Sequence, residues 1–258
     1  MNTICVSAAT RAGSVRHARL MQDDLIFDIG MHNGMDTEWY LAKGFRVVGV
    51  EANPLLARQV ADRFSDAIAA GRLVIENVGV ADKAGELPFY VNWENDEWSS
   101  FDRELGTRND TRFEIIPVIC VNATTLFERH GTPYFVKIDI EGADDLVVRA
   151  VGRLDEKPKY MSVEDNGFTS LLAMHAAGCR SFKFMDQIEK WRIELPNPPL
   201  EGRFAEGRFG AYTSGPFGAE VPGQWLSLDE AALFYLTHIR PPGIGLGDHW
   251  WDIHAKFS

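Results

Sequence analysis

The sequence predicts an α/β fold built on a doubly wound, mostly parallel sheet. Apolar, strand-like runs alternate with helix-like segments from residue 25 onward, a glycine-containing turn follows the first run, and acidic residues end several of the runs. This alternation is typical of parallel sheets, in which a helix connects each strand to the next. The 258 residues, 45% of them hydrophobic, are enough to bury one large core. We expect a single domain over residues 25–258, divided into a core at 25–185 and a C-terminal extension at 186–258.

The first predicted unit is a strand, a turn, a helix and a second strand. The strand is expected at 25–30 and the helix at 35–43, where Gly44 provides a C-terminal cap. The second strand is expected at 46–51. Such a unit is parallel and right-handed. Residues 1–24 show no clear periodicity, so we expect them to form an arm outside the core.

The middle of the chain continues this alternation and then departs from it. Asn53 and Pro54 predict the start of a helix whose apolar residues recur every four positions until Gly71, and a third strand follows at 73–80. Strands at 86–91 and 114–121 then enclose a polar segment, which predicts an inserted β-hairpin that covers the sheet. The remaining core elements are expected as a helix at 122–130, a strand at 134–140, a helix at 143–151, a strand at 160–163, a helix at 169–177 and a strand at 181–185.

The C-terminal extension has a different composition. Residues 196–224 are rich in proline and glycine and contain several aromatic residues, a composition typical of lids and binding loops. A helix at 226–239 and a final strand at 250–257 are expected after it. We therefore predict a long, lid-like C-terminal segment.

Composition and charge restrict the partners of the protein. A formal net charge of −11 is unfavourable for binding nucleic acid, which needs clustered lysine and arginine. No apolar run has the length of a signal peptide core or a membrane span, so we expect a cytoplasmic protein without a membrane partner. Cys5, Cys120 and Cys179 have neither disulfide-framework nor zinc-site spacing and are expected to be inert. A small-molecule or glycan substrate is expected, and a homo-oligomer remains open.

The turn at 28–34, with the sequence DIGMHNG, has the features of a nucleotide-binding turn. An acid follows an apolar strand, and two glycines precede a helix whose backbone N–H groups point back at the turn. A dinucleotide fingerprint would require glycine at 30, 32 and 35, but His32 and Met35 occupy two of these positions. Glu51, at the end of the next strand, can accept hydrogen bonds from both hydroxyls of a ribose. Together, the turn at 28–34 and Glu51 favour a nucleoside-binding site over a purely structural turn.

Three motifs together resemble the FkbM-type family of class I S-adenosylmethionine (SAM)-dependent methyltransferases. They are FDIGMHNG at 27–34, VEANP at 50–54 and VKIDIEGA at 136–143, and the resemblance extends over about residues 25–185. The family often has Ala-Asn where this chain has Met31 and His32. The resemblance implies the Rossmann-like fold of class I methyltransferases, here with the inserted β-hairpin and the long C-terminal segment, and SAM as the cofactor.

The resemblance also implies a set of cofactor-binding residues. Gly30 and Gly34 would let the backbone approach the methionine portion of SAM, Asp28 would hold the turn and favour the cationic cofactor, and Glu51 would bind the ribose. Asn77 and Val78 lie where the family has its adenine pocket. The complete expected set is Asp28, Gly30, His32, Asn33, Gly34, Glu51, Asn53, Asn77, Val78 and Asp139.

Methyl transfer to an oxygen is the implied reaction, with a hydroxyl of a sugar, glycan or glycosylated metabolite as acceptor. An alcohol needs a general base or a metal to remove its proton. Asp139, at the end of the fourth core strand, is the first candidate, and His32 and His249 are metal-free alternatives, with His254 nearby. Asp139, Asp165 and Asn166 alternatively resemble the magnesium site of catechol-type O-methyltransferases.

Three other functions remain open from the sequence. The acceptor is alternatively a hydroxyl of a non-sugar secondary metabolite. A binding protein that keeps the fold without turnover is a second alternative, although acids are present at 28, 51 and 139. A nicotinamide dehydrogenase is disfavoured because the required glycines are missing.

Overall fold

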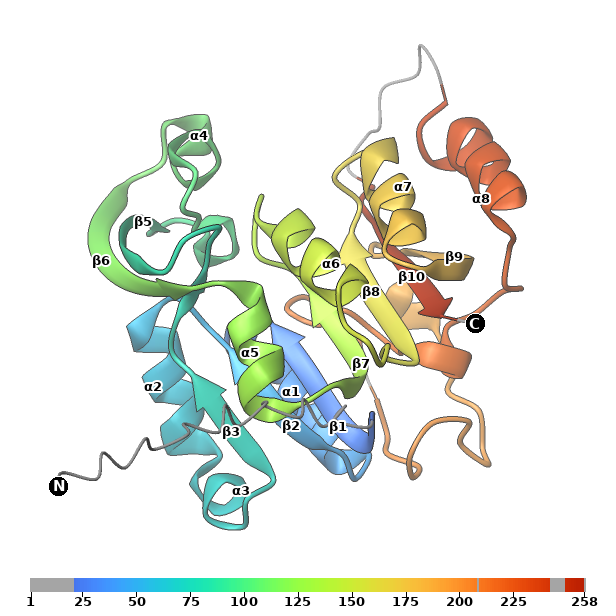
Figure 1. Cartoon of the computed structure of the whole chain (residues 1–258), viewed down its shortest axis with the longest axis horizontal. Coiled ribbons are helices and arrows are strands. Elements are labelled where there is room, and N and C mark those ends of the chain that lie inside the picture. Colours follow the sequence, from blue (N-terminus) through green and yellow to red (C-terminus); the bar gives the residue numbers. More distant parts are fainter. Residues whose placement is uncertain (1–20, 208, 242–248, 258) are drawn as a thin grey trace, which may run out of the picture.

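The computed structural model describes residues 21–207, 209–241 and 249–257, and these form a seven-stranded sheet with helices on both faces (Figure 1). The order of the strands is β3-β2-β1-β7-β8-β10-β9. All neighbouring pairs are parallel except those of β10, which is antiparallel to both β8 and β9. The strands are β1 (Gln22–Ile29), β2 (Arg46–Val50), β3 (Leu73–Glu76), β7 (Pro133–Ile138), β8 (Tyr160–Glu164), β9 (Cys179–Asp186) and β10 (Trp251–Phe257). The predicted doubly wound, mostly parallel sheet is confirmed.

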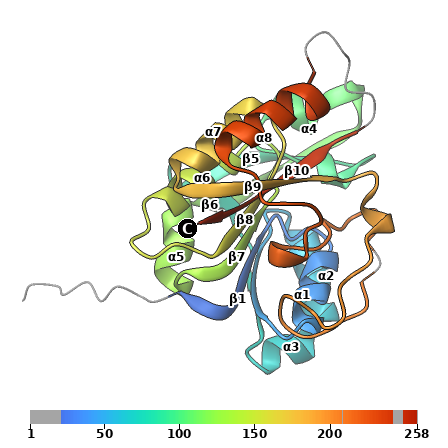
Figure 2. The ribbon, with the colours of Figure 1, turned by 90° about the vertical axis from the view of Figure 1, so that its right-hand side faces the viewer.

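Two apolar layers pack on this sheet, and Figure 2 shows the helices that lie on its two faces. Strand β1 serves both, because Phe27 packs into one layer and Ile26 into the other. The first layer contains α5 (Ala123–His130), α6 (Asp144–Gly152), α7 (Phe168–Ala176) and α8 (Leu228–Phe234). The second contains α1 (Met35–Ala42) and α3 (Ser65–Ala69), beside α2 (Pro54–Arg63). Strands buried on both faces explain the continuous apolar runs in the sequence.

Several element boundaries differ from those expected. Strand β1 begins at Gln22, so the expected arm at 1–24 loses its last residues to the sheet, and residues 1–20 lie outside the described residues. The helix expected as far as Gly71 is interrupted at Phe64, whose φ of −108° and ψ of 27° are not helical, and α3 follows. The helix expected at 226–239 is α8 followed by a π-helical turn, Tyr235–Ile239.

The strand expected at 73–80 is divided between two sheets. Strand β3 ends at Glu76, and Asn77 turns the chain by donating a side-chain hydrogen bond to the Glu51 carbonyl at 2.8 Å. Gly79 and Val80 then form β4 in a second sheet of order β4-β6-β5. Here β5 (Gly85–Asn92) and β6 (Phe113–Val121) are antiparallel. The predicted inserted hairpin is therefore confirmed.

The segment between β5 and β6, residues 93–112, folds over the carboxyl edge of the main sheet; we call it the insertion. It contains the short helices η1 (Asp96–Trp98), α4 (Arg103–Gly106) and η2 (Arg108–Asp110). Phe101 packs so closely on Gly79 that an added Cβ there would lie 2.2 Å from its ring. Ser100 Oγ also donates to the Glu141 carbonyl at 2.8 Å. The insertion is thus packed against the sheet edge.

The proline- and glycine-rich segment is partly core rather than wholly a lid. Phe217 is fully buried and stacks on Phe135 of β7 with ring centroids 4.6 Å apart. Phe209 packs edge-on against Trp39 of α1. These two aromatic residues anchor the segment, and Ala211–Ser214 between them line the cavity described below.

No helix in the described part of the chain has the length and apolar character needed to span a membrane. Cys120 and Cys179 are buried free thiols, and burial raises the pKa of each, which agrees with the inert role expected for them. Cys5 lies outside the described residues.

Candidate active site

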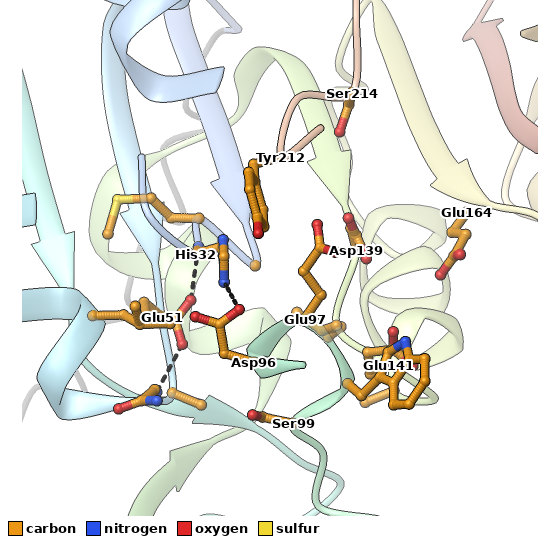
Figure 3. A pocket seen from close by; sticks show the side chains of 18 of the residues that line it. His32, Glu51, Asp96, Glu97, Ser99, Asp139, Glu141, Glu164, Tyr212 and Ser214 are labelled. Atoms are coloured by element: carbon orange, nitrogen blue, oxygen red, sulfur yellow. Dashed lines mark hydrogen bonds and ion pairs between the residues drawn. The ribbon is translucent and has the colours of Figure 1, made fainter. Parts of the chain in front are cut away.

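A cavity of about 580 Å³ lies at the carboxyl ends of the central strands, beneath the insertion (Figure 3). The turn after β1, the ends of β2, β7 and β8, the start of β10 and the insertion all contribute to its lining. Ala211–Ser214 of the C-terminal extension close one side. Ligands of open α/β sheets bind at this edge, so this cavity is the candidate active site.

The turn after β1 brings two strand ends together. Gly30 has a φ of +84°, and a Cβ added there would lie 1.7 Å from the carbonyl oxygen of Asp139. The N–H groups of Gly30 and Met31 both donate to the Val50 carbonyl at 3.0 Å. Gly34, with a φ of +78°, is the N-cap residue of α1 and packs on Val60. Both glycines are therefore required by the backbone path itself.

Glu51 is fixed at the rim of this turn. Its carboxylate accepts hydrogen bonds from the backbone N–H of His32 at 2.8 Å and of Asn53 at 2.7 Å (Figure 3). Burial raises the pKa of Glu51, and the two backbone hydrogen bonds oppose that rise. Each carboxylate oxygen keeps a further acceptor site, so the group can receive two hydroxyls from the cavity.

Asp28 lies below the cavity rather than in its lining. It accepts a hydrogen bond from Thr37 Oγ1 at 2.7 Å, and its Oδ1 lies 3.5 Å from Lys137 Nζ. Burial raises the pKa of Asp28. Asp28 thus lies beneath the turn, next to Lys137, and its part in cofactor binding stays a prediction.

Lys137 connects the turn to the end of β7. Its Nζ donates to the Gly30 carbonyl at 2.7 Å and lies 3.6 Å from Asp139 Oδ2. Burial alone would lower the pKa of Lys137, but the carboxylates of Asp139 and Asp28 outweigh it and raise that pKa. Lys137 is therefore a permanent cation that positions Asp139.

Asp139 faces the cavity between Glu51 and Glu164 in Figure 3. Its side chain is 45% exposed, whereas that of its partner Lys137 is 6% exposed. A carboxylate held at a strand end but open to the cavity can reach a ligand. Asp139 is thus a sequence-predicted catalytic candidate that is open to the cavity, and His32, its metal-free alternative, also lines the cavity.

Two acids that the sequence did not single out form another part of the wall. Glu164 ends β8, and Asp252 lies directly opposite it on the antiparallel strand β10. Burial, followed by the charges of Asp139, Glu141, Asp252 and Asp144, raises the pKa of Glu164 to about 9. Burial also raises the pKa of Asp252 well above its usual range. Glu164 is the last residue of a strand, and Glu51 directly follows one. The same pattern, an acid at the end of an apolar strand, could therefore have identified Glu164 from the sequence.

Further lining residues come from the first helix and the extension. Asp36 of α1 accepts the backbone N–H of Ser214 at 2.9 Å, and burial raises its pKa to about 6. The ring of Tyr212 stacks on His32 with centroids 5.6 Å apart. His32 Nε2 in turn lies 3.1 Å from Asp96 Oδ1 of the insertion. His32 therefore contacts both the insertion and the C-terminal extension from the turn after β1.

The insertion also contributes charge to the cavity. Arg108 lies 3.0 Å from Glu141 Oε1, and burial raises the pKa of Glu141 to about 7 although Arg108 lowers it. Glu97 and Trp98 line the same side. Because the insertion is distant in sequence from the strand ends, no local pattern marks these residues.

The remaining predicted cofactor residues divide into two groups. Asn53 and Val78 line the cavity. Asn33, Gly34 and Asn77 lie outside its lining, and Asn77 instead holds the Glu51 backbone. Of the two residues predicted for the adenine pocket, Asn77 and Val78, Val78 is the one that lines the cavity.

The two later histidines lie away from the cavity lining. His249 is 50% exposed and lies 2.7 Å from Asp186 Oδ2. His254 is buried within β10, where burial lowers its pKa to about 3. The geometry does not bring either imidazole to the acceptor side of Asp139.

The metal set expected from the sequence is not assembled. Asp165 accepts hydrogen bonds from Tyr235 Oη and Arg240 Nε, both at 2.9 Å, and borders a separate shallow hollow. Asn166 lines the main cavity, but its amide donates to Asp144 at 3.2 Å. Within the described ranges, no group of three histidine, cysteine or acidic residues is arranged to hold a metal ion. Asp165 is thus bonded to Tyr235 and Arg240, outside the lining of the cavity that Asp139 faces.

The stability of the protein is expected to fall as the pH rises from about 5 to 9. Glu164 keeps its proton up to a pKa of about 9 in the folded state, whereas the unfolded chain releases it near the usual 4.5. The folded state therefore binds more protons in this window, and each pH unit costs up to about 1.4 kcal/mol. Urea unfolding at pH 6, 7 and 8 should show a shallower decline for Glu164→Gln, and parallel curves for the two proteins would contradict the assignment.

The strand order, with the antiparallel strand inserted beside the last edge strand, and the cavity at the carboxyl ends define the Rossmann-like class I methyltransferase fold. The family model described as "Methyltransferase FkbM domain" matches residues 28–191 of the chain. The chain therefore belongs to the FkbM methyltransferase family. No curated protein matches the chain.

Solved structures of low sequence identity resemble the chain. One is the methyltransferase FkbM from Methylobacillus flagellatus, at 17% identity and a TM-score of 0.36, with 60% of this chain and 35% of that chain covered. Another is precorrin-6y C5,15-methyltransferase from Geobacter metallireducens, at 10% identity and a TM-score of 0.40, with 93% and 84% covered. A third is the [4+2]-cyclase SpnF, at 12% identity and a TM-score of 0.40, with 92% and 76% covered. The chain thus spans about a third of the length of the similar FkbM protein.

Proposed function

We propose that the protein is a SAM-dependent O-methyltransferase. The observation that carries this proposal is Glu51, a buried carboxylate fixed by two backbone N–H groups at the rim of a large cavity. Such a group suits the cis-diol of a ribose, and SAM is the ribose-containing methyl donor that the family implies.

The residues present fit SAM. Glu51 would hold the ribose, and the apolar side chains of Val78 and Leu56 line the cavity nearby for the adenine. The turn at Gly30 would face the methionine portion. When bound, SAM supplies a methyl group activated by a positively charged sulfur, and the carboxylates of this cavity are suited to that charge.

The chain's own contribution to the reaction is positioning and proton removal. Lys137 holds Asp139 at the end of β7, where it can accept the proton of an acceptor hydroxyl. The insertion and Ala211–Ser214 form part of the cavity wall and would limit the access of water to a bound ligand. Methyl transfer requires an in-line approach, so this fixed arrangement supplies much of the rate.

A hydroxyl of a sugar, glycan or glycosylated metabolite remains our proposed acceptor. The cavity combines aromatic rings, from Trp98, Tyr212 and Trp250, with many polar groups, and sugars bind to such surfaces by stacking and hydrogen bonding. Its acidic lining supports the expectation that nucleic acid is not the substrate. The cytoplasmic location, a homo-oligomer and the alternative of a non-sugar metabolite stay predictions.

Methyl-labelled SAM offered to the purified protein tests the function directly. With candidate sugars, glycans and polyketide alcohols present, we expect label in a base-stable ether on a sugar hydroxyl. Labelled product on a non-sugar alcohol would replace the acceptor class. Binding of SAM without transfer to any of these acceptors would contradict the proposed function.

A further inference from the structure

Glu164 and Asp252 form a pair of neighbouring carboxylates in the cavity wall. They are directly opposite each other in the antiparallel pairing of β8 and β10, so their side chains lie on the same face of the sheet. Both line the cavity, and Asp252 is only 8% exposed. In Figure 3, Glu164 lies on the opposite side of the cavity from Glu51, with Asp139 between them. With SAM bound at Glu51 as proposed, the pair would lie on the far side of Asp139, where an acceptor would bind.

Within the described residues, neither carboxylate forms a side-chain hydrogen bond or an ion pair; Asp252 is buried and Glu164 is partly buried. The cations of the same cavity are engaged elsewhere. Lys190 donates to Gln187 Oε1 at 2.8 Å and to the Thr213 carbonyl. Lys137 donates to the Gly30 carbonyl, and Arg108 pairs with Glu141. The charges of Lys190 and Lys137 do lower the pKa of Asp252, but burial outweighs them and keeps that pKa well above its usual range. Within the described residues, no cation therefore forms a direct ion pair with either carboxylate.

Burying two unpaired carboxylates is unfavourable unless a proton or a cation compensates them. In the free protein, a retained proton compensates in part, which agrees with the raised pKa of about 9 for Glu164. An ammonium group has three N–H donors and a full positive charge, so it can satisfy both carboxylates at once. No metal-binding group of three side chains exists in the described residues, which leaves an organic cation as the matching ligand.

We propose that Glu164 and Asp252 bind a protonated amine of the acceptor, so that the acceptor is an amine-bearing alcohol of the amino sugar class. This inference rests on the proposed O-methyl transfer and adds its substrate class. An ammonium has no lone pair, so the nitrogen held by the pair is not the atom that is methylated. The amine instead orients a hydroxyl of the same molecule toward Asp139 and the methyl donor. The proton of that hydroxyl passes to Asp139 as the methyl–sulfur bond breaks and the methyl–oxygen bond forms.

Calorimetric titration of the full chain loaded with S-adenosylhomocysteine tests the amine site. The probes are D-glucosamine, N-acetyl-D-glucosamine and D-glucose, which differ only in the group at C2: an ammonium, an uncharged acetamide and a hydroxyl, respectively. We expect D-glucosamine to bind at least tenfold more tightly than the other two. The double variant Glu164→Gln, Asp252→Asn keeps the side-chain volumes and should bind all three alike, whereas the exposed control Glu86→Gln should keep the preference.

The outcomes separate this inference from the proposed function. Equal binding of the three sugars, no binding of D-glucosamine, or an unchanged preference in the double variant would overturn the amine site. Loss of S-adenosylhomocysteine binding in the double variant alone would also overturn it, because the pair would then hold the amino group of the cofactor. Failure of the unaltered protein to bind S-adenosylhomocysteine would instead refute the proposed function.

Discussion

Replacement of Glu51 by alanine is expected to weaken the binding of SAM by roughly 100- to 20,000-fold. Two hydrogen bonds from the ribose hydroxyls to a charged acceptor are each worth about 1.5–3 kcal/mol, and each 1.4 kcal/mol changes affinity tenfold. The carboxylate is already oriented by the N–H groups of His32 and Asn53. Little conformational entropy is therefore lost when it forms these hydrogen bonds to the ribose. Calorimetry with SAM measures the effect.

The same substitution removes two backbone hydrogen bonds, so a specific control is needed. A 2′-deoxy analogue of S-adenosylhomocysteine should bind the unaltered protein more weakly than S-adenosylhomocysteine itself. Glu51→Ala should no longer distinguish the two ligands. If the variant still discriminates between them, another residue binds the ribose. Thermal unfolding of both proteins separates this effect from a loss of fold.

Asp139→Asn is expected to lower kcat by roughly 100- to 10,000-fold, the range typical of a lost general base. The amide keeps the shape of the side chain and removes the ability to accept a proton. Affinity for SAM should change little, because the turn at Gly30 is held by Lys137 and the Val50 carbonyl. Turnover of labelled SAM and calorimetric binding are measured on the same preparation.

Asp66→Asn provides a matched control on the surface of α3, where the carboxylate is exposed. It should retain full activity. Turnover of Asp139→Asn within threefold of the unaltered protein would exclude Asp139 as the base. A parallel loss of SAM binding and turnover would instead assign Asp139 to the cofactor.

Much of the fold follows from local sequence patterns. Asn53 caps α2 by accepting the Leu55 N–H, as its position before Pro54 predicts. The alternation of apolar strands with helices predicts the parallel order, because each crossover is short and right-handed. The predicted strand at 73–80 was wrong as one element, since a local pattern does not reveal that Asn77 bonds to the distant Glu51 backbone.

The candidate site was less accessible to sequence analysis. Glu51 and Asp139 follow strand ends and were predicted, and both line the cavity. Asp165 and Glu164 are adjacent in sequence, yet Asp165 turns toward Tyr235 and Arg240 while Glu164 lines the cavity. Neighbouring residues at a strand end point in different directions, and the sequence pattern does not indicate which one faces the ligand.

The sequence by itself determined the order of strands, turns and helices, the cofactor turn at 28–34 and the family, because caps, glycines and apolar periodicity act between near neighbours. Only the tertiary structure decided which acids share a wall. Strand β10 comes last in the chain but lies between β8 and β9, and this placement sets Asp252 opposite Glu164. Burial and charge proximity, which determine the pKa of each group, exist only after that strand is in place.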